Sequence, residues 1–85
     1  MKLTVRFFAS VKEQLGKDVE EIEVPAGVSS VAGLRAHLMA RGETWKTVFS
    51  EKKLIRVAVN QEMAQPGAPI KAGDEVAFFP PVTGG

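Results

Sequence analysis

The chain has 85 residues, of which 45% are hydrophobic and 25% charged, a size and composition typical of one small globular domain. Eleven Lys and Arg residues against ten Asp and Glu residues give a formal net charge of +1, which lacks the basic excess of a nucleic-acid-binding domain. The apolar runs fall far short of the roughly 20 residues that a membrane helix needs. Arg6 interrupts the stretch that a secretory signal would keep apolar, so we expect a cytoplasmic protein. From the charge and the short apolar runs we expect no nucleic-acid partner and no membrane partner.

Cysteine is absent and His37 is the single histidine, which excludes structural zinc sites, disulfides and thiol nucleophiles. The sequence also lacks a phosphate-binding glycine loop, a dinucleotide fingerprint and a zinc-protease helix motif. His37 falls on the polar side of a predicted helix, so we interpret it as a solvated side chain. We therefore expect no metal site and no cofactor bound by this chain.

Two strands and a short helical turn are predicted near the amino terminus. Residues 2–9 alternate in hydrophobicity and place one set of side chains inward: Leu3, Val5 and Phe7. The spacing of Ser10 and Glu13 is that of a capping box and predicts a turn of helix that ends at Gly16. Residues 20–24 alternate again, so the two strands are expected to pair as a hairpin.

The main helix is predicted to begin at Ser29 or Ser30, either of which is a good N-cap, and to end at about Arg41. Its apolar stripe has helical spacing and consists of Val31, Leu34 and Leu38. Gly42 stands where a C′ glycine is expected. Gly33 weakens the helix, which indicates a close approach to the sheet.

The second half of the chain is predicted to contain strands at 54–59 and 75–79. A polar turn at 60–62 and an apolar restart at 63–64 predict a second hairpin. Residues 44–53 show no clean period and are expected to form an irregular connection that caps the core.

This order of elements predicts an α+β fold, a mixed sheet with one main helix across one face, which is the β-grasp or ubiquitin-like arrangement. The alternative is a ferredoxin-like fold, which needs a second full helix that residues 44–53 do not readily supply. We expect a β-grasp domain at 1–79 and an extended tail at 80–85.

The tail is the unusual feature of the sequence. From Ala77 to Gly85 there is no charged side chain, and Pro80 and Pro81 stop the strand and favour an extended exit. Residues 80–85 span at most roughly 20 Å, enough to carry a terminal carboxylate into a partner's pocket. Gly84 and Gly85 lack Cβ atoms and can pass a narrow channel. The alternative is a frayed terminus on a plain interaction module.

A diglycine terminus on a β-grasp domain resembles the ubiquitin-like family, and the tail is similar to that of the small, sulfur-carrying subunits of molybdopterin synthase. The resemblance covers nearly the whole chain. The segments that carry it are Arg6-Phe7-Phe8-Ala9, Leu34-Arg35-x-x-Leu38, Val57-Ala58-Val59-Asn60-Gln61, Gly73-Asp74-Glu75-Val76-Ala77-Phe78-Phe79 and Phe78-Phe79-Pro80-Pro81-Val82-Thr83-Gly84-Gly85.

The resemblance implies a non-catalytic, sulfur-donating subunit of a sulfurtransferase complex in molybdenum cofactor biosynthesis. A partner like the ubiquitin-activating enzyme would use ATP to adenylate Gly85, and a sulfur donor would then displace AMP to leave a thiocarboxylate. The tail would enter a channel of the large synthase subunit and pass sulfur to a pyranopterin precursor. The resemblance also implies a heterotetramer of large and small subunits. The tail residues that would lie in that channel are Pro80, Pro81, Val82, Thr83 and Gly84.

Two other carriers of a terminal diglycine remain open at this point. One is the sulfur carrier for thiamine thiazole synthesis, whose members are usually shorter and lack the Phe-Phe-Pro-Pro exit. The other is a protein modifier joined to lysines through Gly85.

The surface expected to meet the large subunit is the strand face turned away from the helix. Phe8 and Phe79 have the parity opposite to the core residues of their strands, and Met63 closes a hairpin beside them. Lys12 and Arg56 lie near this patch and are expected to steer an acidic partner surface, with the small effect that exposed charges have.

Overall fold

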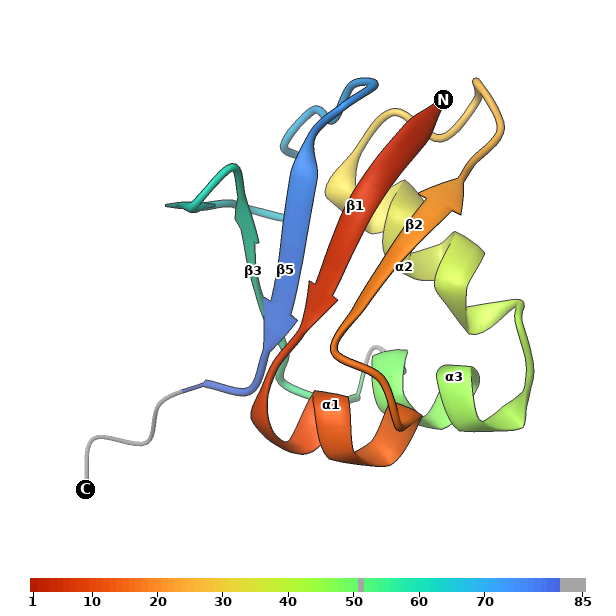
Figure 1. Ribbon diagram of the computed structural model, residues 1–85, viewed down its shortest axis with the longest axis vertical. Helices are drawn as coiled ribbons and strands as arrows, with labels where there is room; N and C mark the ends of the chain where they lie inside the picture. The colour runs from red at the N-terminus through yellow and green to blue at the C-terminus, as the bar shows by residue number, and fades with distance from the viewer. Residues whose placement is uncertain (51, 82–85) are drawn as a thin grey trace.

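The computed structural model describes residues 1–50 and 52–81. The elements in this part of the chain are β1 (Lys2–Phe7), α1 (Ala9–Leu15), β2 (Val19–Glu23), α2 (Val31–Met39), α3 (Glu43–Phe49), β3 (Arg56–Val59), β4 (Glu62–Met63) and β5 (Glu75–Phe79). The strands form one mixed sheet in the order β2-β1-β5-β3-β4 (Figure 1). β1 runs parallel to β5, and the other neighbours are antiparallel.

The predicted β-grasp architecture is confirmed, with α2 lying across one face of the sheet (Figure 1). The alternation predicted in the first strand is also confirmed, because every second residue of β1 is fully buried. The largest fully buried side chains come from the sheet and from the helices packed on it: Leu3, Val5, Phe7, Leu34, Leu38, Phe49, Val76 and Phe78. No helix in the described part of the chain is long and apolar enough to cross a bilayer.

The start of α2 confirms one prediction and corrects another. The Ser30 hydroxyl accepts a hydrogen bond from the Gly33 amide at 3.1 Å, so Ser30 is the N-cap. The close approach predicted at Gly33 is not to the sheet. A Cβ atom at Gly33 would meet Ser30 Oγ at 3.4 Å and Val28 Cγ1 at 3.6 Å, both in the turn that leads into the helix.

The capping box predicted at Ser10 is wrong. α1 begins at Ala9, its N-cap is Phe8, and no side chain caps its first turn. Ser10 lies inside that turn because β1 passes directly into the helix through Ala9, whose φ of 52° is unusual for a residue with a side chain. The predicted end at Gly16 is confirmed, since its φ is 73° and its amide donates to the Lys12 carbonyl at 2.9 Å.

The irregular connection predicted at 44–53 is also wrong over its first half, where α3 forms. Gly42 is not the C′ residue of α2, which ends at the C-cap Ala40; with a φ of 148° it is instead the residue before α3. α3 packs against α1 and α2 beyond the end of the sheet at which β5 ends (Figure 1). It adds Phe49 to the core, where its ring meets the Phe78 ring edge-on at 5.0 Å between centroids.

The second predicted hairpin is confirmed as β3 and β4. Its two central residues, Asn60 and Gln61, have φ of 51° and 70°, the pair of positive values that a type I′ turn requires. Asn60 Nδ2 donates to the buried Asp74 carboxylate at 3.0 Å, and the Glu75 amide donates to Asn60 Oδ1 at 3.0 Å. These bonds fix the hairpin to the start of β5.

Candidate functional site

The end of β5 is the part of the structure from which the predicted tail leaves. β5 is paired on both sides, with β1 and with β3, so the strand that leads into the tail is held in the middle of the sheet. Pairing stops at Phe79, because Pro80 has no amide hydrogen to continue a ladder. Pro80 and Pro81 are half-buried beside β3, whereas the predictions for Val82, Thr83, Gly84 and Gly85 fall outside the described residues.

The face of the sheet opposite α2 forms a second feature, which we call the open sheet face. The strand registers align five side chains across it in one row, in the order Val19, Arg6, Ala77, Ala58 and Met63. Val19 is 43% and Met63 59% exposed, so the row ends in large apolar side chains at both edges. Arg6 Nε donates to Glu75 Oε2 at 2.8 Å within this face.

Four of the five predicted interface residues gather around the end of β5. Phe79 lies opposite Arg56 in the ladder between β5 and β3. Phe8 continues β1 in extended conformation, is 46% exposed, and its amide donates to the Phe78 carbonyl at 3.1 Å. Lys12 stands one turn further along α1, where its amide approaches the Phe8 carbonyl at 3.3 Å. Met63 joins the same face from β4, one row further from the tail.

Charge is unevenly distributed over this face. At its β2 edge the acidic residues are paired: the chain's amino group lies 2.9 Å from Glu23 and lowers the pKa of that carboxyl, chiefly through the hydrogen bond between them. Lys2 Nζ approaches Glu21 at 4.0 Å. Near the tail, Lys12 and Arg56 are exposed and make no ion pair with a described residue. This end therefore offers positive charge to a partner.

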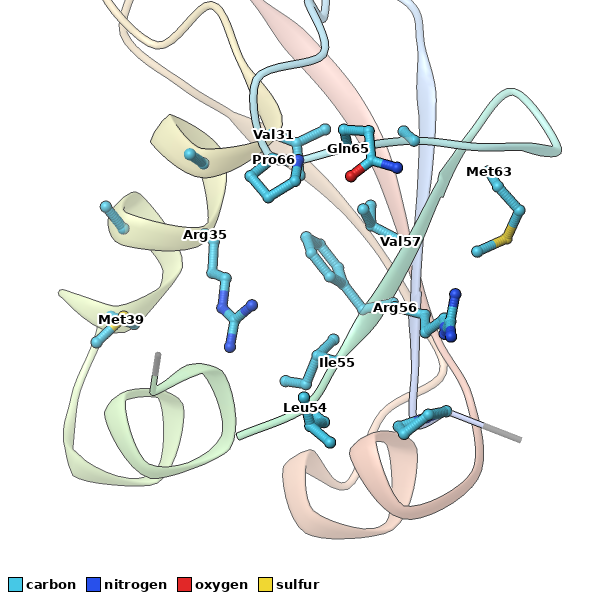
Figure 2. A pocket seen from close by; sticks show the side chains of 15 residues that line it. Val31, Arg35, Met39, Leu54, Ile55, Arg56, Val57, Met63, Gln65 and Pro66 are labelled. Carbon is cyan, nitrogen blue, oxygen red and sulfur yellow. The ribbon is translucent and has the colours of Figure 1, made fainter. Parts of the chain in front are cut away.

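A third feature, which the sequence analysis missed, is a groove between α2 and the outer edge of β3. We call it the α2–β3 groove; its volume is about 630 Å³. Figure 2 shows Arg35 and Met39 reaching toward it from α2, and Leu54, Ile55 and Val57 from the opposite wall. Pro81 lines its end, so the groove borders the start of the tail. A sequence signal did exist, because the exposed apolar Leu54 directly precedes a strand.

Arg35 shapes one end of this groove. Its guanidinium donates to three backbone carbonyls that follow or end α3, at 2.7 Å to Phe49, 2.6 Å to Ser50 and 3.0 Å to Lys53. The Phe49 and Ser50 carbonyls are among the groups that a helix end leaves without partners, whereas Lys53 lies beyond the helix. Arg35 therefore holds the segment that leads from α3 into β3 against α2. In the described part of the chain, no three His, Cys, Asp or Glu side chains are placed to hold a metal ion.

Comparison with known proteins agrees with this architecture. Residues 5–85 match the ThiS family, and the chain belongs to this family of ubiquitin-like β-grasp proteins. It is 45% identical to the molybdopterin synthase sulfur carrier subunit of Escherichia coli (strain K12) over 83 residues, which cover 98% of this chain and 99% of that protein. Within the β-grasp proteins it is therefore a member of the molybdopterin synthase sulfur carrier subunits.

Two solved structures extend the comparison. The complex of subunits 1 and 2 of the molybdopterin-converting factor from Helicobacter pylori contains a chain that is 28% identical, with a TM-score of 0.66 and full coverage of both chains. The small archaeal modifier protein 1 of Haloferax volcanii is 26% identical with a TM-score of 0.74, covering 95% of this chain and 98% of that one.

Proposed function

We propose that this chain carries sulfur on its terminal glycine and delivers it to the large subunit of molybdopterin synthase. The observation that carries the proposal is the similarity to molybdopterin synthase sulfur carrier subunits over 98% of the chain, together with a family match that reaches Gly85. The fold is consistent with this role, since a strand held on both sides leads directly into the tail.

The chemistry takes place at the main-chain carboxylate of Gly85. A carboxylate is a poor electrophile, so an adenylating partner first joins one of its oxygens to the α-phosphate of ATP and releases pyrophosphate. A hydrosulfide equivalent from a sulfur donor then attacks the carbonyl carbon and displaces AMP. The product is a thiocarboxylate, whose sulfur can attack a pyranopterin precursor in the partner's active site. In this scheme the chain supplies the reacting group, and the partners supply the acids and bases.

Docking on the large subunit would use the open sheet face near the tail. The complex known for the Helicobacter pylori subunits supports such a partner. Phe8, Phe79 and Met63 would supply apolar anchors, while Lys12 and Arg56 would face acidic residues. Because these residues surround the exit of the tail, the same docking would aim Gly85 into the partner.

A second candidate is a protein modifier, favoured by the likeness to the small archaeal modifier protein 1. Both functions need adenylation of the same glycine and differ in what attacks the activated carbonyl. A lysine amine would give an isopeptide bond, whereas sulfur would give a thiocarboxylate. Mass spectrometry of tryptic peptides from cell extract separates the two functions. Lysines joined to the C-terminal residues of this chain would favour the protein modifier.

The direct test of the carrier function alters the terminus. Deleting Gly85 withdraws the carboxylate by about 3.3 Å, and misplacement on the order of 1 Å can cost about a hundredfold in rate. Adding one residue after Gly85 turns its carboxyl group into a peptide bond, so the free carboxylate belongs to the added residue. We expect both variants to keep the fold by circular dichroism but to lose ATP-dependent thiocarboxylate formation and conversion of the precursor by the large subunit.

Replacing Gly84 with leucine tests the channel itself. A bulky side chain is expected to exclude the tail from a channel shaped for glycine, so turnover should fail although the terminal carbon is unchanged. A chain lacking Gly85 that loads sulfur and supports turnover at the normal rate would refute the terminal-carrier mechanism.

A further inference from the structure

The α2–β3 groove exposes an unpaired stretch of strand edge. β4 covers β3 at Ala58 and Val59, and the Ala64 amide donates to the Val57 carbonyl at 3.0 Å. One step further toward the tail, Ile55 makes no backbone hydrogen bond with any residue that the structure describes. Because alternate residues of an extended chain direct their backbone groups to the same side, Ile55 faces the same outer edge as Val57. An open edge of this kind can accept another strand.

The side chains around this edge define what an incoming strand should carry. Apolar groups from both walls line the groove, and Leu54 at its mouth is 81% exposed. The lining contains two arginines and no acidic residue. Arg35 is engaged with the carbonyls after α3, whereas Arg56 makes no ion pair with a described residue. The chemistry that fits is an extended segment with a large aliphatic side chain and a carboxylate that reaches Arg56.

The position of the groove indicates which protein brings that segment. Pro81 lines the groove and is the last described residue before the tail continues. A protein that holds the tail is therefore next to the groove, and Arg56 and Met63 belong both to the groove lining and to the open sheet face. One partner can thus cover both surfaces without a break.

From these observations we infer that an extended, acidic and aliphatic segment of the large subunit adds as a strand to the outer edge at Ile55 and fills the α2–β3 groove. This inference rests on the proposed function, since it takes the large subunit as the holder of the tail. It extends the contact with the large subunit from the open sheet face into the groove.

The first measurement is amide hydrogen exchange in the unaltered chain, alone and in complex with the large subunit. A strand added at this edge should slow exchange of the Ile55 amide about tenfold or more, because that amide gains a hydrogen bond. An exchange rate at Ile55 that is the same in the complex and in the free chain would overturn the inference.

The second measurement is the affinity of two matched variants for the large subunit. Ala36→Glu places a carboxylate on the groove wall of α2, where it repels an acidic segment and occupies space. Ala40→Glu makes the same change one turn further along, at an exposed residue outside the lining. We expect about tenfold weaker binding for the first, or about 1.4 kcal/mol, and a change within about twofold for the second.

Thiocarboxylate formation measured in the same preparations separates this inference from the proposed function. Ala36→Glu should still load sulfur, because loading depends on the terminus. If the unaltered chain takes up no sulfur, the proposed function fails. If it loads normally and Ala36→Glu binds the large subunit as Ala40→Glu does, the groove assignment alone fails.

Discussion

At the scale of single residues, Phe79 is the side chain that best links the fold to the tail. It is the last residue of the central strand β5, it lies opposite Arg56, and it is only half-buried on the open sheet face. Its neighbour Phe78 points the other way into the core and is 1% exposed. We therefore expect Phe78 to contribute to stability and Phe79 to recognition of the partner.

Replacing Phe79 with alanine tests this separation. We expect association with the large subunit to weaken by about 2 kcal/mol or more, the loss typical of an aromatic anchor, with little change in thermal unfolding. Calorimetric titration of the two subunits measures the binding. Val19→Ala, at the opposite edge of the same face, is the control and should bind nearly as the unaltered chain does. Equal affinities for the Phe79 variant and the unaltered chain would contradict the anchor assignment.

The sheet face on which each strand residue lies was predictable, because side chains in a strand point alternately to one face and the other. The alternation in β1 and β5 therefore placed Phe8 and Phe79 on the face opposite Phe7 and Phe78, as the structure confirms. Helix N-caps are harder to predict from the sequence. Ser10 has the right spacing to Glu13, yet β1 leads straight into α1 and the backbone of Phe8 closes the first turn.

At the scale of elements, α3 is the helix that the sequence analysis missed. Trp45, Val48 and Phe49 do have helical i, i+3, i+4 spacing, but a helix of seven residues is short and its N-cap, Gly42, offers no side chain. Its stability comes from packing against the strands: the Phe49 ring lies 6.2 Å from the Phe7 ring and 5.0 Å from the Phe78 ring, measured between centroids. Such tertiary contacts cannot be read from a local window.

Phe49→Ala measures how much this packing contributes. Removing a fully buried ring typically costs about 3–5 kcal/mol, which is a large part of the stability of a small domain. Urea unfolding followed by the fluorescence of the single tryptophan gives the free energy directly. Lys46→Ala, at an exposed position of the same helix, should change it by about 0.5 kcal/mol or less. Similar values for the two variants would show that α3 is peripheral.

A cluster around Glu20 ties β2 to the segment between α2 and α3. Arg41 donates to the Glu20 carboxylate at 2.6 and 3.2 Å, and Lys17 does so at 2.9 Å. The Arg41 guanidinium also lies over the Trp45 ring at 4.3 Å from its centroid. The hydrogen bond from Arg41 is the main reason that the pKa of Glu20 is lowered in the folded chain.

A lowered pKa in the folded state makes stability depend on acid. The contribution of Glu20 is fully present above the ordinary glutamate pKa of about 4.3, and it is lost as the pH falls through the lower folded value. Between neutral pH and about pH 3, the free energy of unfolding should therefore fall less for Glu20→Gln than for the unaltered chain. The difference between the two decreases should be at most about 1 kcal/mol, because the ion pair is partly exposed. Urea unfolding at several pH values measures this. Glu13→Gln, at an exposed residue of α1, should follow the unaltered chain; parallel curves for all three proteins would contradict the assignment.

At the scale of the whole molecule, every candidate surface borders one end of the sheet. β5 ends there between β1 and β3, and α1 and α3 lie beyond it (Figure 1). Phe8 and Phe79 flank the tail on the open sheet face, and Pro81 lines the α2–β3 groove on the other side of β3. A partner that holds the tail can therefore reach two surfaces with different chemistry.

The overall topology was predictable and the groove was not. Five short strands and one helix with an apolar stripe have few ways to bury their apolar faces, so the β-grasp arrangement followed from the order of elements. The groove depends on where β4 stops covering β3 and on the hydrogen bonds that join Arg35 of α2 to Phe49, Ser50 and Lys53. The Arg35 bonds join segments 14 to 18 residues apart, which no local pattern encodes.

The central claim is that sulfur travels on the carboxyl group of Gly85. The measurement that tests it most directly is the intact mass of the chain purified with its partners from cells that synthesise the cofactor, followed by fragmentation of its C-terminal peptide. The account predicts that a fraction of the chain has one oxygen replaced by sulfur, and that the added mass lies on Gly85. A chain recovered wholly with an unaltered terminus, or with sulfur on any other residue, would contradict it.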